Sequence, residues 1–398
     1  MNKIIAICLF LIISRSFSQI SISPQISTFY TDNLYRSPQK TGDWLSNFAI
    51  NLVYEHPNFP FSFNLVPEYN WYKEHTQQNF AFVNTSFEYY PFLDKNEIWQ
   101  FYGSLDWATR LNKEDYKFYN YQQLRMSVAL YRDGDFALNQ WTYQLQWRNF
   151  DQYDALSSVS NYFNWQFNKP LPTRTTLIAN VGLASRYYEN QIRYIVINDT
   201  LDWSNWRSSG RNQRPPKIIT RTIPVNSNPV NLNQLQCSIR LAQNILPTLG
   251  VYLQYRKSFD LASSGLFQNY ASYLGDDELF DDPLSYLNNE WSSQITWLMP
   301  GRWKLQLHSS FNRKRYLKET AFISENDLTG SGNFRRDTKI DCALNLSKKF
   351  TVKDKLTLNL DGQIYYVQNQ SNSYWFDYTN LIWGLNLNLI FLQGANNE

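Results

Sequence analysis

One short segment of this sequence has the spacing of a catalytic pair. His308 precedes Ser310 by two residues, so on a β-strand both side chains would point to the same side, where a histidine can activate a hydroxyl. That side would also carry Lys304 and Gln306, which makes it a polar, hydrated face. We interpret His308 as a histidine in contact with water, and we predict that the protein is not an enzyme.

Other side chains that could bind a metal are dispersed. His56 and His75 fall in a predicted turn and a predicted loop, and three scattered histidines do not supply a metal site. The acidic run within residues 276–282 lacks the alternating spacing and the glycine of a calcium-binding loop. Cys237 and Cys342 fall on apolar faces of predicted strands four apart, farther than the roughly 6 Å between Cα atoms that a disulfide requires. We expect no cofactor and two free thiols.

The last predicted strand, Asn380 to Phe391, displays the pattern that organises the chain. Successive side chains of a strand point to opposite sides, so alternation along the sequence separates two faces. One face carries Leu381, Trp383, Leu385, Leu387, Leu389 and Phe391, and the other carries Asn380, Gly384, Asn386 and Asn388. The strand therefore has one apolar side and one polar side.

The same alternation recurs along the whole chain. The apolar faces include Leu124-Met126-Val128-Leu130, Trp141-Tyr143-Leu145-Trp147, Leu177-Ala179-Val181-Leu183, Leu249-Val251-Leu253-Tyr255, Trp303-Leu305-Leu307-Phe311 and Leu356-Leu358-Leu360-Ile364. None of these faces carries Lys, Arg, Asp or Glu. A charge there would cost about 2–4 kcal/mol at the middle of a bilayer, so the absence of charge favours contact with lipid.

Strand length separates a membrane barrel from a secreted sandwich or β-helix. Sandwich strands run about 5–6 residues, whereas the alternation here persists for about 10–13. Strands in lipid cannot leave backbone groups unpaired at an edge, so the sheet must close. The excess of aromatic residues, 17% with 14 Trp and 28 Tyr, suits aromatic girdles at two membrane interfaces. We predict an all-β, transmembrane, antiparallel up-and-down β-barrel.

The turns predict the topology. Short connections are expected at Pro57–Pro60, Leu93–Glu97, Arg132–Asp135, Lys169–Thr173, Leu246–Thr248, Pro300–Arg302 and Thr351–Lys355, with longer polar loops between them. These marks divide the chain into about 16 strands, with both chain ends on the short-turn side. Short periplasmic turns and long extracellular loops are typical of outer-membrane barrels.

The N-terminus has the features of an export signal. Lys3 precedes an apolar run from Ile4 to Ile13, and Ser16-Phe17-Ser18 fits a cleavage site before Gln19. No linker divides the remainder. We predict a signal peptide at residues 1–18 and a single outer-membrane β-barrel domain at residues 19–398. A net charge of +3 indicates no nucleic-acid partner.

The chain resembles the outer-membrane β-barrels of Gram-negative bacteria, because the last strand ends on an aromatic residue and places Gly384 as in their C-terminal assembly signal. The resemblance implies contacts with outer-membrane lipid, lipopolysaccharide and the barrel-assembly machinery. The Asn-, Tyr- and Lys-rich composition looks like that of Bacteroidota proteins, and Asp32 to Pro38 resembles a segment of barrels associated with exopolysaccharide export. Outer-membrane phospholipases have Asn and Gly after the serine of their His-x-Ser signature, whereas Phe311 and Asn312 follow Ser310 here.

The inward face holds the candidate site. A lumen of about sixteen strands holds water, and its predicted lining is rich in amides, including Gln144, Gln146 and Gln236. The predicted lining charges are Arg110, Arg125, Arg148, Arg186, Arg240 and Arg256 with Glu68, Asp106, Glu290, Asp341 and Asp361. Arg110, Arg148, Arg186 and Arg256 near the outer strand ends could form a basic wall opposite an acidic wall from Glu290, Asp341 and Asp361. The alternative is scattered charge that keeps a lumen wet.

Two outer loops differ in sign. Residues 190–229 are basic and residues 258–283 are acidic, so the loops could pair with each other, bind a solute or partner, or be solvated surface. The candidate binding residues are Trp203, Trp206, Arg207, Arg211, Tyr270, Tyr273, Asp276 and Asp277.

Three functions are compatible with these features. The first is a passive channel for hydrophilic solutes, with sugars or oligosaccharides favoured by the neutral, amide-rich lumen. The second is an export conduit for a polysaccharide or another secreted polymer. The third is a structural or secretion-accessory barrel whose outer loops bind a partner while the lumen is plugged.

Overall fold

The computed structural model describes residues 20–94, 96–134, 136–152, 156–189, 191–200, 218–227, 229–264, 282–325, 327, 330–353 and 356–391. Side chains are described in all of these ranges except 191–200, 218–227 and 352–353. The predicted signal peptide and the candidate loop residues at 203–211 and 270–277 therefore lie outside the described residues.

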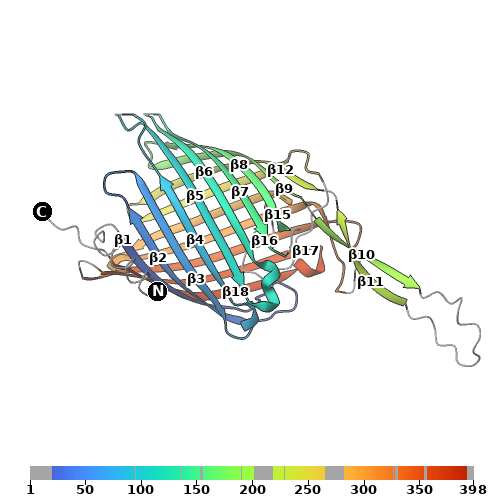
Figure 1. The fold of residues 1–398 in the computed structure, drawn as a ribbon. Helices are drawn as coiled ribbons and strands as arrows, with labels where there is room; N and C mark the ends of the chain where they lie inside the picture. The colour runs from blue at the N-terminus through green and yellow to red at the C-terminus, as the bar shows by residue number, and fades with distance from the viewer. Residues whose placement is uncertain are drawn as a thin grey trace, which may run out of the picture.

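Sixteen antiparallel strands close into one barrel, in the order β1-β18-β17-β16-β15-β14-β13-β12-β9-β8-β7-β6-β5-β4-β3-β2 (Figure 1). The strands of the barrel are β1 (Ile20–Thr31), β2 (Asp43–Glu55), β3 (Phe61–Tyr72), β4 (Phe80–Tyr89), β5 (Trp99–Asn112), β6 (Tyr121–Asp133), β7 (Leu138–Phe150), β8 (Ser158–Pro170), β9 (Thr175–Tyr188), β12 (Val230–Leu246), β13 (Leu249–Asp260), β14 (Tyr286–Met299), β15 (Trp303–Thr320), β16 (Phe334–Lys353), β17 (Leu356–Ser371) and β18 (Tyr378–Phe391). The predicted fold class and strand number are confirmed.

One predicted loop contains regular structure. Residues 190–229 were expected to form an irregular polar connection, but β10 (Gln191–Thr200) and β11 (Ile218–Ser227) pair as a separate two-stranded sheet. Figure 1 shows this hairpin extending away from the barrel wall. The segment lacks the long apolar alternation of the barrel strands, and short strands that pair only with each other need no such pattern.

The connections differ in length at the two ends of the barrel. Short turns join β2 to β3, β12 to β13 and β14 to β15, the last through the 3-10 helix η6 (Pro300–Arg302). The other end carries longer segments with η2 (Thr76–Gln78), η3 (Glu114–Tyr119) and η7 (Tyr374–Phe376). No helix in the described ranges is long and apolar enough to cross a membrane. We refer to the long-loop end as the outer end and the short-turn end as the periplasmic end.

The two faces of the barrel wall are inverted relative to a soluble protein. Large apolar side chains on the outside are exposed, including Leu385 at 60%, Met126 at 51% and Trp291 at 49%. Polar side chains on the inside are buried, including Gln146, Gln234 and Gln254. Cys237 and Cys342 are free thiols on the outward face of β12 and β16. The predicted assignment of the apolar and polar faces is therefore confirmed.

Aromatic rings on the outer surface group near both ends of the strands. Tyr30, Trp44 and Trp383 form one cluster, with ring centroids 5.0–5.9 Å apart. Trp99 and Trp141 stack near the short turns, with centroids 6.1 Å apart. A closed cylinder with an apolar exterior, aromatic rings near both rims and a polar interior satisfies every requirement for spanning an outer membrane. The protein is an outer-membrane barrel.

The seam that closes the barrel joins the first strand to the last. Gly384 of β18 pairs with Phe29 of β1. A Cβ atom at position 384 would overlap the Phe29 ring and the Thr28 carbonyl oxygen and lie 2.8 Å from the Phe29 Cα. Only glycine lets the two strands approach to pairing distance at this point.

We expect Gly384→Ala to impair closure, because the added methyl group meets backbone atoms that cannot move without separating β1 from β18. The loss should appear as a smaller heat-resistant, fast-migrating fraction in gel electrophoresis of the refolded protein. Gly362→Ala is the matched control, because a Cβ atom there makes ordinary contacts, with a Leu385 methyl group at 3.5 Å and the Leu346 carbonyl oxygen at 3.9 Å. Equal folding of the two variants would contradict the role of the seam.

Leu385→Arg should also prevent insertion, since an exposed arginine on the lipid face costs about 2–4 kcal/mol near the membrane midplane. Gln144→Arg adds the same charge on the inward face of β7 and should assemble normally. Denaturant unfolding in lipid vesicles measures both, and equal tolerance would invert the assignment of the two faces.

Candidate functional site

The residues predicted to line the lumen all lie on the inward face of barrel strands. They alternate with the exposed apolar positions along β3, β5, β6, β7, β9, β12, β13, β14, β16 and β17. The set comprises Arg110, Arg125, Arg148, Arg186, Arg240, Arg256, Glu68, Asp106, Glu290, Asp341, Asp361, Gln144, Gln146 and Gln236. Their part in the passage of a solute stays a prediction.

The amides of the lining bond to neighbours on adjacent strands or along the same strand. Gln146 donates to Gln123 Oε1 at 3.1 Å, and Arg148 donates to the same oxygen at 2.9 Å. Gln236 donates to Gln234 at 3.4 Å, and Arg240 donates to Gln254 at 2.7 Å. These contacts orient the amides along the wall. Water or a hydroxylated solute can bind the amide donors and acceptors that these hydrogen bonds do not use.

Charges on the inward face pair within one wall rather than across the lumen. Arg125 lies 3.2 Å from Asp106, Arg186 lies 2.9 Å from Asp282, and Lys339 lies 3.4 Å from Asp341. The opposite charges of each pair lie 2.9–3.4 Å apart, so the field of each pair weakens quickly with distance from the wall.

The hypothesis of a basic wall opposite an acidic wall needs a correction. Arg256 and Glu290 were assigned to opposite walls, yet they are direct partners on the adjacent strands β13 and β14, with Nη1 and Oε2 3.6 Å apart. The register of the two strands decides this pairing. The arrangement favours the alternative of locally balanced charges in a wet lumen.

The remaining acidic candidates have neutral hydrogen-bond partners, in addition to the Lys339 ion pair of Asp341, or lie along the lining. Glu68 accepts a hydrogen bond from Asn47 at 3.1 Å. Asp341 accepts hydrogen bonds from the Ser310 and Tyr365 hydroxyl groups. Asp361 lies on the inward face of β17, half-buried.

The lumen is packed most densely at its outer end. Arg110 is 4% exposed and Arg148 and Arg186 are each 8% exposed, all near the outer ends of their strands. The Arg110 guanidinium lies 3.7 Å from the centroid of the Phe80 ring. Inward positions nearer the periplasmic end, such as Gln144 and Asp361, are half-exposed. These arginine side chains are therefore enclosed by their neighbours near the outer mouth.

Three small apolar clusters add to this packing at the outer end of the barrel. Each lies where an outer connection meets the ends of two strands, and together they draw η3 and η7 against the inner wall. The clusters are Tyr119-Tyr121-Phe150-Leu156, Ala184-Tyr188-Val230-Leu232-Leu284 and Val367-Phe376-Tyr378.

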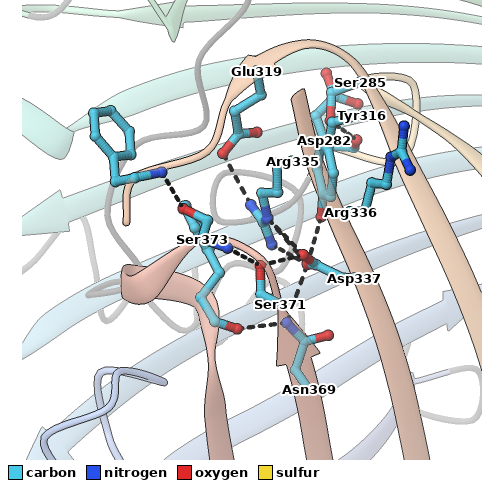
Figure 2. A network of polar contacts seen from close by, with 12 residues as sticks. Asp282, Ser285, Tyr316, Glu319, Arg335, Arg336, Asp337, Asn369, Ser371 and Ser373 are labelled. Atoms are coloured by element: carbon cyan, nitrogen blue, oxygen red, sulfur yellow. Dashed lines mark hydrogen bonds and ion pairs between the residues drawn. The ribbon is translucent and has the colours of Figure 1, made fainter. Parts of the chain in front are cut away.

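A buried ionic network fixes the mouth on the β15–β17 side. The Arg335 side chain is 1% exposed and lies between Glu319, at 3.0 Å, and Asp337, which accepts from its Nε at 3.0 Å. Figure 2 shows Asn369 and Ser371 reaching the same Asp337 carboxylate, at 3.1 Å and 2.7 Å. The Phe376 ring of η7 stacks on the guanidinium at 3.3 Å. The network thus anchors an outer connection to the inner wall.

A second buried carboxylate anchors the β9–β12 side. Asp282, whose side chain is fully buried, accepts hydrogen bonds from the Tyr188 hydroxyl at 2.7 Å and the Leu284 amide at 2.9 Å, besides its ion pair with Arg186. Gln234 donates to the Leu284 and Tyr286 carbonyl oxygens. The chain entering β14 is therefore held inside the rim.

Apart from Arg186, the residues of these two anchors were not among the predicted site residues. Arg335, Asp337, Lys339 and Asp341 alternate in sign at every second position of β16, which was a readable signal for an inward charged row. Glu319 lies at the end of β15 and Asp282 in the connection before β14, where the sequence does not say whether a carboxylate points inward or outward.

The sequence pair His308 and Ser310 is not assembled as a catalytic pair. His308 Nδ1 lies 3.3 Å from the Tyr252 hydroxyl, and Ser310 donates to Asp341. Within the described ranges, no three His, Cys, Asp or Glu side chains are grouped so that they could hold a metal ion.

Comparisons with known proteins give similarities in structure alone. No protein-family model matches the sequence, and no curated protein matches it. OpdL of Pseudomonas aeruginosa is similar in structure, with a TM-score of 0.43 and 10% identity over 94% of this chain and 98% of that one. OpdK of P. aeruginosa, solved with vanillate, has a TM-score of 0.45 and 9% identity over 94% of this chain and 99% of that one. OccAB1 of Acinetobacter baumannii has a TM-score of 0.49 and 11% identity over 94% of this chain and 96% of that one.

We expect Arg335→Gln to destabilise the protein by roughly 3–5 kcal/mol, because it removes the guanidinium that lies between the buried Asp337 and Glu319 carboxylates. The free energy of unfolding in detergent, measured by denaturant titration, checks this. Lys349→Gln is the control, since Lys349 is exposed on the same strand. An Arg335→Gln protein as stable as the control would refute the anchoring role of the network.

Proposed function

We propose that the protein is a passive channel for small hydrophilic solutes, with sugars or oligosaccharides as its preferred class. The observation that carries this proposal is the inverted wall, apolar outside and lined inside by amides, hydroxyl groups and locally paired charges. A cylinder of this construction separates a polar interior from lipid.

The balance of the lining favours neutral solutes. A channel that selects ions concentrates one sign along its constriction, because an unpaired charge raises the local concentration of its counter-ion. Here Arg125 and Arg256 each have a carboxylate within 4 Å on the adjacent strand, and Arg186 has one in the connection that leads into β14. Amide groups such as those of Gln144 and Gln146 offer both donors and acceptors to solute hydroxyl groups.

The packed outer mouth supports a second candidate. The side chains of Arg110, Arg148, Arg186 and Arg335 are nearly fully buried at that end. A barrel closed there at rest would act as a structural or secretion-accessory protein that binds a partner from outside, and it would not conduct.

Solute uptake and conductance separate the two candidates. Vesicles containing the purified, folded protein should swell in isotonic monosaccharide and disaccharide solutions faster than protein-free vesicles. Planar bilayers should show discrete openings with weak ion selectivity, because the charges of the wall balance. Absence of both swelling and openings in folded protein would overturn the channel proposal in favour of the closed barrel.

Breaking an ion pair of the lining should change the ion selectivity of the channel. Arg256→Gln leaves the Glu290 carboxylate without its partner, so the reversal potential in a salt gradient should shift toward cations. Lys169→Gln removes an equal charge from the outward face of β8 near the periplasmic rim and should leave the reversal potential unchanged. Equal shifts in both variants would show that Arg256 does not face the conducting path.

A further inference from the structure

Four cationic side chains emerge on the outside of the barrel near its outer end, on neighbouring strands. Register places Lys257 of β13, Asn289 of β14 and Arg313 of β15 in one row. The next row toward the outer end contains Arg315 of β15 directly opposite Arg336 of β16. All four cations are exposed. We call Lys257, Arg313, Arg315 and Arg336 the basic rim patch.

The row directly below the patch is aromatic. Tyr255, Trp291 and Phe311 are register partners on the same three strands, two residues nearer the membrane centre, or about 7 Å. The Tyr255 and Trp291 rings are 4.7 Å apart, and the Arg313 guanidinium lies 5.4 Å from the Phe311 ring. Aromatic rings mark the boundary between hydrocarbon and head groups. The patch therefore lies at head-group height.

The acidic residues of the same strands point the other way. Glu290 and Asp337 face the lumen, where they pair with Arg256 and Arg335. The four patch cations form no ion pair with any residue in the described part of the chain. In Figure 2 the Arg336 side chain leaves β16 away from the network around Arg335. Among the described residues, the patch is thus a concentration of positive charge that no carboxylate pairs with.

In the described strands, outward-facing cations near the outer end occur in this one sector of the barrel. At the outer halves of the other described barrel strands, outward positions carry apolar, aromatic, amide or hydroxyl side chains, such as Gln122, Asn149, Asn233 and Gln370. Arg315 and Arg336 are direct cross-strand partners on one face, and like charges so placed repel each other. An anion bound between the two guanidinium groups would attract both and offset their repulsion.

We propose that the basic rim patch binds the phosphate groups of a phosphorylated glycolipid, lipopolysaccharide, in the outer leaflet. Three of the four cations are arginines, whose planar guanidinium binds phosphate through two parallel hydrogen bonds. Lys257 and Arg313 lie on strands separated by β14, about 10 Å apart, so the patch can contact more than one phosphate of a single lipid. A second copy of this chain would bring the same positive surface against itself and is disfavoured.

Binding of purified lipopolysaccharide to the folded protein in an uncharged detergent tests this directly. We expect native mass spectrometry to detect the complex with wild type. The Arg315→Gln/Arg336→Gln double variant should bind at least about tenfold more weakly, equivalent to about 1.4 kcal/mol. Enzymatically dephosphorylated lipopolysaccharide should lose binding to a similar extent. Arg315→Lys/Arg336→Lys, which keeps the charge, should retain part of the affinity.

The control is Arg132→Gln/Lys169→Gln, which removes two outward cations from the periplasmic rim, where they lie against the rings of Trp99 and Phe136. This variant should bind lipopolysaccharide as wild type does. Heat-resistant gel migration of every variant shows that the barrel is folded. Undiminished binding by the glutamine double variant, or equal binding of dephosphorylated lipid or phosphatidylglycerol, would overturn the proposal. Because the patch faces lipid, conductance is a separate measurement, and its outcome tests the channel proposal alone.

Discussion

The backbone of this protein has to satisfy its own hydrogen bonds, because hydrocarbon offers no partners to an exposed strand edge. Every other feature follows from that constraint. The sheet closes between β1 and β18, the outside becomes apolar, and polar side chains turn inward around a space that the strands cannot fill. The same constraint explains why Gly384 faces Phe29 at the seam, since the pairing distance there leaves no room for a side chain.

Much of this architecture can be predicted from the sequence, because the period of two and the absence of midstrand charge are both local properties. The alternation from Leu381 to Phe391 predicted which side chains face lipid, and turns such as Pro57–Pro60 predicted where strands end. The paired strands β10 and β11 were not predicted, since that hairpin has no lipid-facing side to impose alternation on its sequence. The signal peptide assigned to residues 1–18 and the sugar-like solutes remain proposals.

The interior was harder to predict, because its chemistry depends on register between strands. Arg256 and Glu290 are separated by thirty-four positions along the chain (290 − 256), and nothing local says that they are direct partners on adjacent strands. Inward placement of Arg110 or Gln146 follows from parity, but their burial depends on neighbouring strands, which place the Phe80 ring against Arg110 and Gln123 beside Gln146. The Arg335 network illustrates both limits: its alternation on β16 is readable, whereas its enclosure by Glu319 and Phe376 is not.

The seam between β1 and β18 joins residues that are more than three hundred and fifty positions apart, as with Ile22 and Phe391. These pairs have the largest sequence separation in the barrel, and contacts between residues far apart in the sequence form slowly. Until Phe391 is in place the sheet retains two unsatisfied edges, each of which could recruit a strand from another molecule. Synthesis and export must therefore keep the whole polypeptide from self-association, and a chain truncated before its final strand is left as an aggregation-prone open sheet.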